Sequence, residues 1–156
     1  MSKNLKYFMR EEVKKEIEVE VPGIDSIRDE NGKVVPFLIR KLHTETIDKI
    51  NQMYVTRVPA KDAKKNYIIK DGEIVYRTEK DKVKAFKHIM VEALVYPNLK
   101  DDELMKFFNC VDITEMPQKV FPTQDESAAV SKKVLEVLGL VDPEDVDKKE
   151  IEDAKN

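Results

Sequence analysis

The chain has 156 residues, with 28 Lys and Arg against 31 Asp and Glu, a net charge of -3, 38% charged residues and 41% hydrophobic residues. A chain of this length buries roughly 70% of its unfolded surface, which favours one compact domain over two. The near balance of charge argues against a dedicated nucleic-acid or anionic-membrane binder, because such proteins concentrate Lys and Arg on one face.

Two periodicities follow one another at the N-terminus. Apolar residues recur every three or four positions from Asn4 to Lys15, which predicts a short amphipathic helix or an arm that packs on a partner. Glu then alternates with β-branched residues, which predicts a half-buried strand with Ile17, Val19 and Val21 on its covered face.

A β-hairpin is expected next. Asn31-Gly32 predicts a type I′ turn, in which Glu30 and Lys33 face each other as an opposite-charge pair. The return strand, Val34 to Leu42, contains Pro36, which lacks a backbone donor and favours an edge position. These segments predict an antiparallel unit of two or three strands.

A helix and a second hairpin follow. Thr44 can cap a helix from Glu45 to about Arg57, and a polar loop over Lys61 to Lys65 comes next. Asp71-Gly72 then predicts a tight turn. Pairing outward from that turn matches Lys70 with Glu73, Ile69 with Ile74, Ile68 with Val75 and Tyr67 with Tyr76.

The second half of the chain has the spacing of helices. The clearest pattern starts at about Asp81, includes Val83 and Phe86, and stops at Tyr96-Pro97; we expect it to be the central core helix. Three further helices are expected: a short one capped by Asp101, another over Ile113 to Val120, and a long one from Thr123 to Leu138 with Gly139 as its stop.

The predicted fold is therefore α+β, with an N-terminal antiparallel β-hairpin unit followed by a mainly helical half. Residues 1–140 form the expected single domain, and residues 141–156 are expected to be a charged, frayed tail.

Residues that carry chemistry are few. His43 and His88 are isolated imidazoles, and His88 is expected to be solvated because it lies about 200° around its helix from Phe86. Cys110 follows two phenylalanines and is expected to be a small buried hydrophobic residue. Because it is the single cysteine, an intramolecular disulfide is excluded. We predict no catalytic, cofactor or metal site, and hence no enzyme.

Location and nucleic-acid binding give weaker signals. Neither a membrane-spanning apolar run nor a signal peptide is evident, which favours a cytoplasmic protein. The group Lys61, Lys64, Lys65, Tyr67 and Lys70 is the best candidate for a nucleic-acid patch, but Asp62 and Asp71 dilute its charge and a solvated loop is the preferred interpretation.

Apolar residues in short, proline-punctuated helices are the remaining candidates for binding. A groove lined by Phe and Met adapts readily to an apolar partner. The predicted partner-binding residues are Phe107, Phe108, Val111, Met116 and Phe121, although each taken singly fits the core as well.

Several segments resemble the XkdN-like family of phage tail assembly chaperones. The likeness includes Leu5 to Glu11, Ile27 to Lys33 and Val35-Pro36-Phe37. Its most specific stretch is Val95-Tyr96-Pro97-Asn98-Leu99-Lys100-Asp101-Asp102-Glu103-Leu104, and Met116 to Leu140 is similar to the closing segment of the family. Residues Lys61 to Lys80 depart from the family pattern.

The resemblance implies a non-catalytic protein that binds the phage tape-measure protein and keeps it soluble before the tail tube polymerises. Tail-tube subunits and a longer, frameshifted form of the chain are further candidate partners, since Ala154-Lys155-Asn156 can be encoded by a slip-prone run. Such a protein acts in the bacterial cytoplasm and is absent from the mature virion. The alternative is a structural tail or head-to-tail connector component that stays in the particle.

Overall fold

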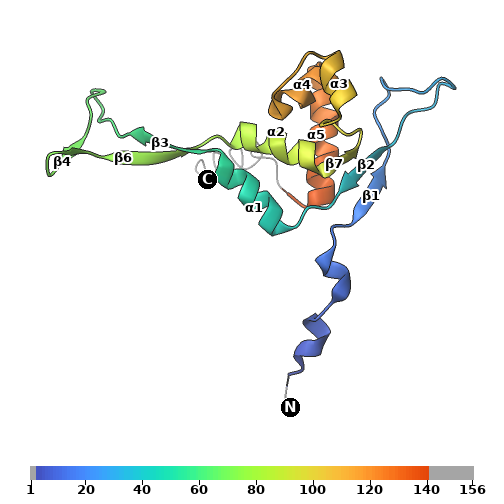
Figure 1. Cartoon of the computed structure of the whole chain (residues 1–156), viewed down its shortest axis with the longest axis horizontal. Coiled ribbons are helices and arrows are strands. Elements are labelled where there is room, and N and C mark those ends of the chain that lie inside the picture. The colour runs from blue at the N-terminus through green and yellow to red at the C-terminus, as the bar shows by residue number, and fades with distance from the viewer. Residues whose placement is uncertain (1–2, 141–156) are drawn as a thin grey trace, which may run out of the picture.

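The computed structural model describes residues 3–140 and has an α+β fold (Figure 1). A three-stranded antiparallel sheet has the order β1-β2-β7, formed by Glu18–Val21, Phe37–Arg40 and Leu94–Tyr96. Strands β1 and β2 form the N-terminal hairpin of this sheet, and helices α2 and α5, described below, pack against β2. The predicted fold class is confirmed.

Helix α2 (Lys82–Ala93) is the centre of the helical part, as predicted. It contacts α1 (Thr44–Met53), α4 (Met116–Val120), α5 (Gln124–Leu138) and strand β2. Its apolar stripe is covered on several sides, and this burial is the main source of stability. The most deeply buried large side chains, from β2, α4, α5 and the segments between them, are Phe37, Ile39, Val91, Leu99, Met116, Phe121, Val130 and Val134.

Strand β2 is the central strand of the sheet, so the predicted edge position is wrong. Pro36 lies immediately before Phe37, the first residue of β2, where its missing N–H interrupts no ladder. Strand β7 occupies the far side of β2, and the β2–β7 register shifts between Leu38 and Ile39.

Strand β1 forms, but it is less covered than predicted. Ile17 and Val19 are 59% and 36% exposed, and only Val21 packs against the core. The alternating pattern correctly predicted a strand, whereas coverage of its face depends on which element lies above it.

The turn after β1 differs from the predicted type I′ turn. Gly32 has φ +78°, but Asn31 does not have a positive φ, and Asp29 rather than Glu30 is hydrogen-bonded to Lys33. The Asp29 carboxylate accepts hydrogen bonds from the backbone N–H groups of Asn31 and Lys33. These bonds favour a turn that is one residue longer.

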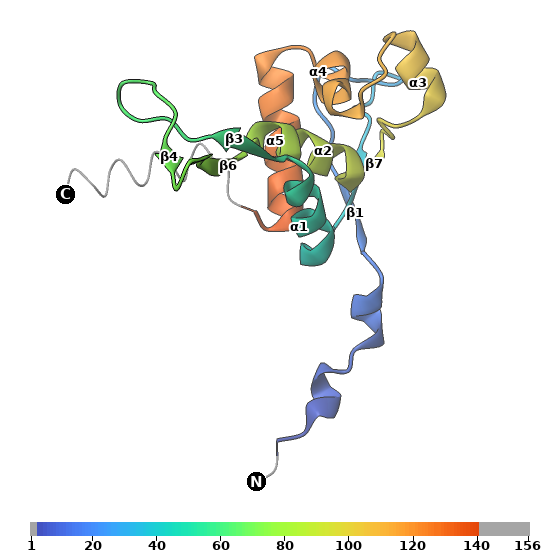
Figure 2. The ribbon, with the colours of Figure 1, turned by 60° about the vertical axis from the view of Figure 1, so that its left-hand side comes forward.

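Helix α1 ends at Met53, earlier than predicted, because Val55–Pro59 forms strand β3. His43, not Thr44, is the N-cap residue. Strand β3 pairs with β6 (Tyr76–Lys80) along its whole length, and the two strands form a ribbon, residues 55–80, that extends from the body (Figures 1 and 2).

The turn at the tip of this ribbon was predicted correctly near its centre. Asp71 and Gly72 both have positive φ angles, and β4 (Ile69–Lys70) pairs with β5 (Glu73–Ile74) in the expected register. The outermost predicted rung is wrong, because Tyr76 pairs with Pro59 and Tyr67 pairs with Lys61.

The later helices follow the sequence signals closely. Asp81, Asp101 and Thr123 cap α2, α3 (Asp102–Phe107) and α5 through side-chain oxygens, and Gly139 ends α5 with φ +68°. The segment predicted as one short helix comprises a 3-10 turn, η3 (Ile113–Glu115), and α4. Helix α2 ends at Ala93 because β7 takes the next three residues, and Val83 is 68% exposed rather than buried.

The remaining expectations concern the two ends of the chain. Residues 4–15 form an arm with two 3-10 turns, η1 (Leu5–Phe8) and η2 (Glu11–Lys14), and not an α-helix. The predicted tail, residues 141–156, lies outside the described residues. Within residues 3–140, none of the helices has the length and hydrophobicity needed to cross a membrane.

Candidate partner-binding surfaces

The structure separates the five predicted partner-binding residues into two groups. Phe107 and Val111 are 80% and 94% exposed, and Phe108 packs partly against the core. Met116 and Phe121 are buried, and the Phe121 ring lies 5.9 Å from the Phe37 ring. Met116 and Phe121 are therefore part of the core and not of an exposed groove. Partner binding stays a prediction for Phe107, Phe108 and Val111, which we call the Phe107 patch.

The end of α3 explains this separation. Asn109 has a positive φ of +50°, and the N–H of Cys110 donates to the carbonyl oxygen of Met105, so the chain reverses directly after the helix. Phe107 meets Phe108 edge to face, with ring centroids 4.9 Å apart. Because of this reversal, Phe107 and Val111 are exposed to solvent, whereas Cys110, the residue just before Val111, is buried.

The N-terminal arm is a second apolar surface. Leu5, Tyr7, Phe8 and Met9 are 67–77% exposed, and neither 3-10 turn contains a buried residue. Figures 1 and 2 both show the arm running away from the body. An ordered segment that places four large apolar side chains in water is typical of a protein-binding element.

The ribbon is a third exposed surface. Beyond Ala60 its residues up to Ile74 are exposed, including Tyr67 and Ile69. A two-stranded ribbon is marginally stable by itself, so exposed β-branched and aromatic residues along it are notable. Residues of the predicted nucleic-acid patch lie here, and the Lys61 ammonium lies 5.2 Å from the centre of the Tyr67 ring.

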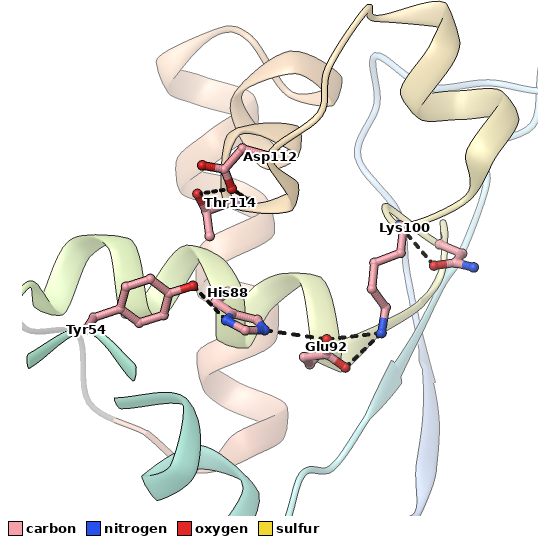
Figure 3. Close-up of polar contacts among 7 residues, drawn as sticks. Tyr54, His88, Glu92, Lys100, Asp112 and Thr114 are labelled. Carbon is pink, nitrogen blue, oxygen red and sulfur yellow. Dashed lines mark hydrogen bonds and ion pairs between the residues drawn. The ribbon is translucent and has the colours of Figure 1, made fainter. Parts of the chain in front are cut away.

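A row of polar side chains connects three elements along α2 (Figure 3). Tyr54 Oη, at the end of α1, lies 2.8 Å from His88 Nδ1. His88 Nε2 lies 3.5 Å from the Glu92 carboxylate, which also accepts two hydrogen bonds of 3.0 Å from Lys100 Nζ. The His88 side chain is only 13% exposed, so the prediction that it is solvated is wrong.

This row has the chemistry of a structural link. Burial raises the pKa of the Tyr54 hydroxyl, and the carboxylate of Asp112 raises it further, which keeps the hydroxyl protonated and able to donate. The row joins α1, α2 and the loop after β7. Sequence reasoning missed it because Tyr54, His88 and Lys100 are far apart in the chain.

Asp112 shows a second local adaptation. Its carboxylate accepts hydrogen bonds from the Thr114 hydroxyl at 2.8 Å and the Thr114 backbone N–H at 2.9 Å. These bonds lower the pKa of Asp112, because they favour the ionised carboxylate. The arrangement caps η3 and accounts for the conformation of the chain entering α4.

The other two candidate residues make local contacts, His43 through its backbone and Cys110 through its thiol. The backbone N–H of His43 donates to the Glu16 carboxylate at 2.6 Å, and the buried Cys110 thiol lies 3.2 Å from the Asp112 carbonyl oxygen. Over residues 3–140, no group of three His, Cys, Asp or Glu side chains is arranged to hold a metal ion.

The sequence profile of the phage XkdN-like tail assembly chaperone proteins matches residues 5–155 of this chain. The chain belongs to this family. The match covers the arm, the sheet and all the described helices, so it concerns the whole fold and not a single motif.

Two relatives from Bacillus subtilis strain 168 are similar to this chaperone over most of their length. The phage-like element PBSX protein XkdN is 27% identical over 154 residues, which are 98% of this chain and 94% of XkdN. The uncharacterized protein YqbN is 31% identical over 139 residues, which are 89% of this chain and 86% of YqbN. The crystal structure of YqbN superimposes with a TM-score of 0.68 and 26% identity, covering 90% of this chain and all of the YqbN chain.

Membership places the three exposed surfaces in the context of tail assembly. In this chaperone the arm, the ribbon and the Phe107 patch each carry exposed apolar or aromatic side chains and lie on different parts of the fold (Figure 2). Sequence reasoning named the residues of the Phe107 patch within a larger group of five and offered the arm as one of two alternatives. At the ribbon it predicted a hairpin and a candidate nucleic-acid patch, but not an exposed apolar surface.

Proposed function

We propose that this chaperone binds the tape-measure protein of its phage or prophage and keeps it soluble until the tail tube polymerises. The observation that carries the proposal is the family match over residues 5–155. The exposed apolar side chains on three separate elements support it. Tail-tube subunits are a second class of partner for the same surfaces.

The physical requirement is to cover apolar surface before assembly. A long helical protein with uncovered apolar faces aggregates, and a chaperone that binds the unassembled state lowers its free concentration by mass action. Three modest contact surfaces on one molecule raise the overall affinity without making any single contact hard to release. Release follows when the polymerising tube replaces these contacts, so the chaperone acts in the host cytoplasm and is absent from the mature particle.

Co-expression tests this proposal. The tape-measure protein encoded in the same phage or prophage is expressed with and without the chaperone, and its soluble fraction and co-purification are measured. We expect both to increase with the chaperone. An unchanged, unbound tape measure would contradict the proposal, and recovery of the chaperone from purified virions would instead favour a structural component of the tail.

A pair of matched variants assigns the contact. The double variant Phe107→Ser/Val111→Ser removes two exposed apolar side chains and should reduce co-purification while lowering the circular-dichroism melting midpoint by only a few degrees. Val83→Ser is the control, because Val83 is 68% exposed on α2, outside the three surfaces. Equal losses in both variants would show that the Phe107 patch has no special role.

A further inference from the structure

A pocket of about 380 Å³ lies where the ribbon leaves the body. Helices α1 and α2 form its walls, and the end of α5 closes one side. The large apolar side chains that line it are Ile47, Val55, Phe86, Ile89, Leu135 and Leu140. Asp48, Asp81, Lys80 and Lys82 also line the pocket, so it combines apolar surface with two carboxylates and two cations, next to a projecting element.

One face of the ribbon continues from this pocket. In an antiparallel pair, directly opposite residues share a face. The register places Val55 opposite Lys80, Arg57 opposite Thr78 and Pro59 opposite Tyr76, and Val55 and Lys80 also line the pocket. The pocket and this ribbon face thus form one continuous surface.

The charge on this ribbon face is positive. Arg57 and Lys80 supply two cations, and the Arg57 guanidinium lies 4.4 Å from the centre of the Tyr76 ring. The carboxylate of the β3–β6 ladder, Glu79, lies on the opposite face, where it pairs with Arg77 at 2.7 Å. The face that adjoins the pocket therefore has no carboxylate among its paired residues.

The ribbon and the C-terminal segment have opposite charge. Residues 55–80 contain seven Lys and Arg against four Asp and Glu, whereas residues 141–156 contain three Lys against seven Asp and Glu. The C-terminal segment also has three large apolar residues, Val141, Val146 and Ile151, separated by charged residues. Its charge is complementary to the cations of the ribbon face, Arg57 and Lys80, and its apolar residues match the apolar side chains of the pocket.

The turn after α5 lies at the edge of the pocket. The N–H of Gly139 donates to the carbonyl oxygen of Glu136, and the N–H of Leu140 donates to that of Leu135. This turn returns the chain toward the helix and sets Leu140 in the wall of the pocket. The described part of the chain therefore ends at the pocket, with Leu140.

We propose that residues 141–156 bind in cis to the pocket and to the cationic face of the ribbon. The apolar side chains of the segment enter the pocket, and its carboxylates face Arg57 and Lys80. The five-residue length of β6 spans about 17 Å, and 16 extended residues reach about 53 Å, so the segment is long enough to cover both. The segment then competes with any partner for this surface, whether or not that partner is a tape-measure protein.

Paramagnetic NMR on the full chain tests this proposal. Cys110→Ser removes the buried thiol and keeps a donor near the Asp112 carbonyl oxygen, and Ala154→Cys supplies one site for a nitroxide label. We expect selective loss of amide signal at Arg57, Lys80 and Phe86. Amides of α3 should keep their intensity.

Two comparisons make the test decisive. The double variant Arg57→Glu/Lys80→Glu should restore the lost signals, whereas the matched double variant Lys64→Glu/Lys65→Glu, at the ribbon tip, should not. Raising the salt to 1 M, where the Debye length is about 3 Å, should also weaken the broadening. The proposal would be overturned if the amide signals of Arg57, Lys80 and Phe86 were not weakened. It would also be overturned if they stayed weak in the Arg57→Glu/Lys80→Glu variant.

A mixed sample identifies binding between chains. Chains that carry the nitroxide but no NMR isotope are mixed with isotope-enriched chains that carry no nitroxide. Binding in cis predicts no signal loss in this mixture. Loss at Arg57 and Lys80 here would overturn the cis proposal and show that the segment binds a second copy.

Discussion

Two phenylalanines 14 positions apart should lose very different amounts of stability on the same substitution. Phe121 is 1% exposed and its ring packs against that of Phe37, whereas Phe107 is 80% exposed at the end of α3. Replacing each by alanine removes the same atoms. The difference in stability therefore measures the difference in burial.

The expected magnitudes follow from these environments. Phe121→Ala leaves a cavity in the core and should lower the free energy of unfolding by about 3–5 kcal/mol. Phe107 covers only about 40 Å² of apolar area, worth about 1 kcal/mol, and the higher helix propensity of alanine offsets roughly half of that. A loss of about 0.5 kcal/mol is expected for Phe107→Ala.

Circular-dichroism melts and urea denaturation of both variants provide the measurement. At about 3 °C per kcal/mol for a domain of this size, Phe121→Ala should lower the midpoint by about 10–15 °C and Phe107→Ala by about 2 °C. Equal shifts would refute the assignment of Phe121 to the core and of Phe107 to the surface. A large shift for Phe107→Ala alone would mean that α3 packs differently from the arrangement described above.

Three further predictions concern single positions. A Cβ on residue 23 would lie 1.8 Å from the carbonyl oxygen of Val35, so Gly23→Ala should lower the free energy of unfolding by about 2–4 kcal/mol in urea titrations; an unchanged midpoint would contradict the close approach. Lys65 has a φ of +67°, so Lys65→Gly should relieve strain and raise the free energy of unfolding by about 0.5–1 kcal/mol, whereas Lys65→Ala should give no gain. The lowered pKa of Asp112 adds stability above its unfolded pKa of about 3.9, and this stability is lost as pH falls through the folded pKa. The stability gap between wild type and Asp112→Asn, measured by urea titration, should therefore shrink between pH 6 and pH 2, and a constant gap would contradict the role of the Thr114 hydrogen bonds.

The elements that sequence reasoning predicted well are those with local signals. The caps Asp101 and Thr123 and the stop at Gly139 each act within four residues, and all three operate as expected; Asp81, where the pattern of α2 was expected to start, is also a cap. The turn at Asp71-Gly72 has the same property, because both residues tolerate a positive φ. Local chemistry therefore predicted the helices of the second half with small errors at their ends.

The errors arise where distant segments compete for the same residues. Residues 55–57 continue the helical pattern of α1, but pairing with residues 78–80 makes them a strand. The same pairing removes Tyr76 from its predicted partner. His88 is solvated on a helical projection, yet Tyr54 from the end of α1 covers it and supplies a hydrogen bond.

The candidate surface shows the same division. Composition identified a cluster of Phe, Met and Val between residues 107 and 121, and the structure shows that α4 buries Met116 and Phe121 while a left-handed residue at Asn109 leaves Phe107 and Val111 outside. No periodic pattern distinguishes these cases, since the helices are too short for a stripe to be evident. The family resemblance, by contrast, rested on sequence alone, and the profile match over residues 5–155 confirms it.

By itself, the sequence determined the α+β class, the caps of α3 and α5, the tight turn of the ribbon and the family to which the chain belongs. Only the tertiary structure decided that β2 is central, that β3 and β6 form a projecting ribbon, and that its cationic face adjoins an apolar pocket. The physical reason is the range of the interactions. Caps and turns depend on hydrogen bonds between near neighbours, whereas strand order and burial depend on contacts between residues that only the complete fold brings together.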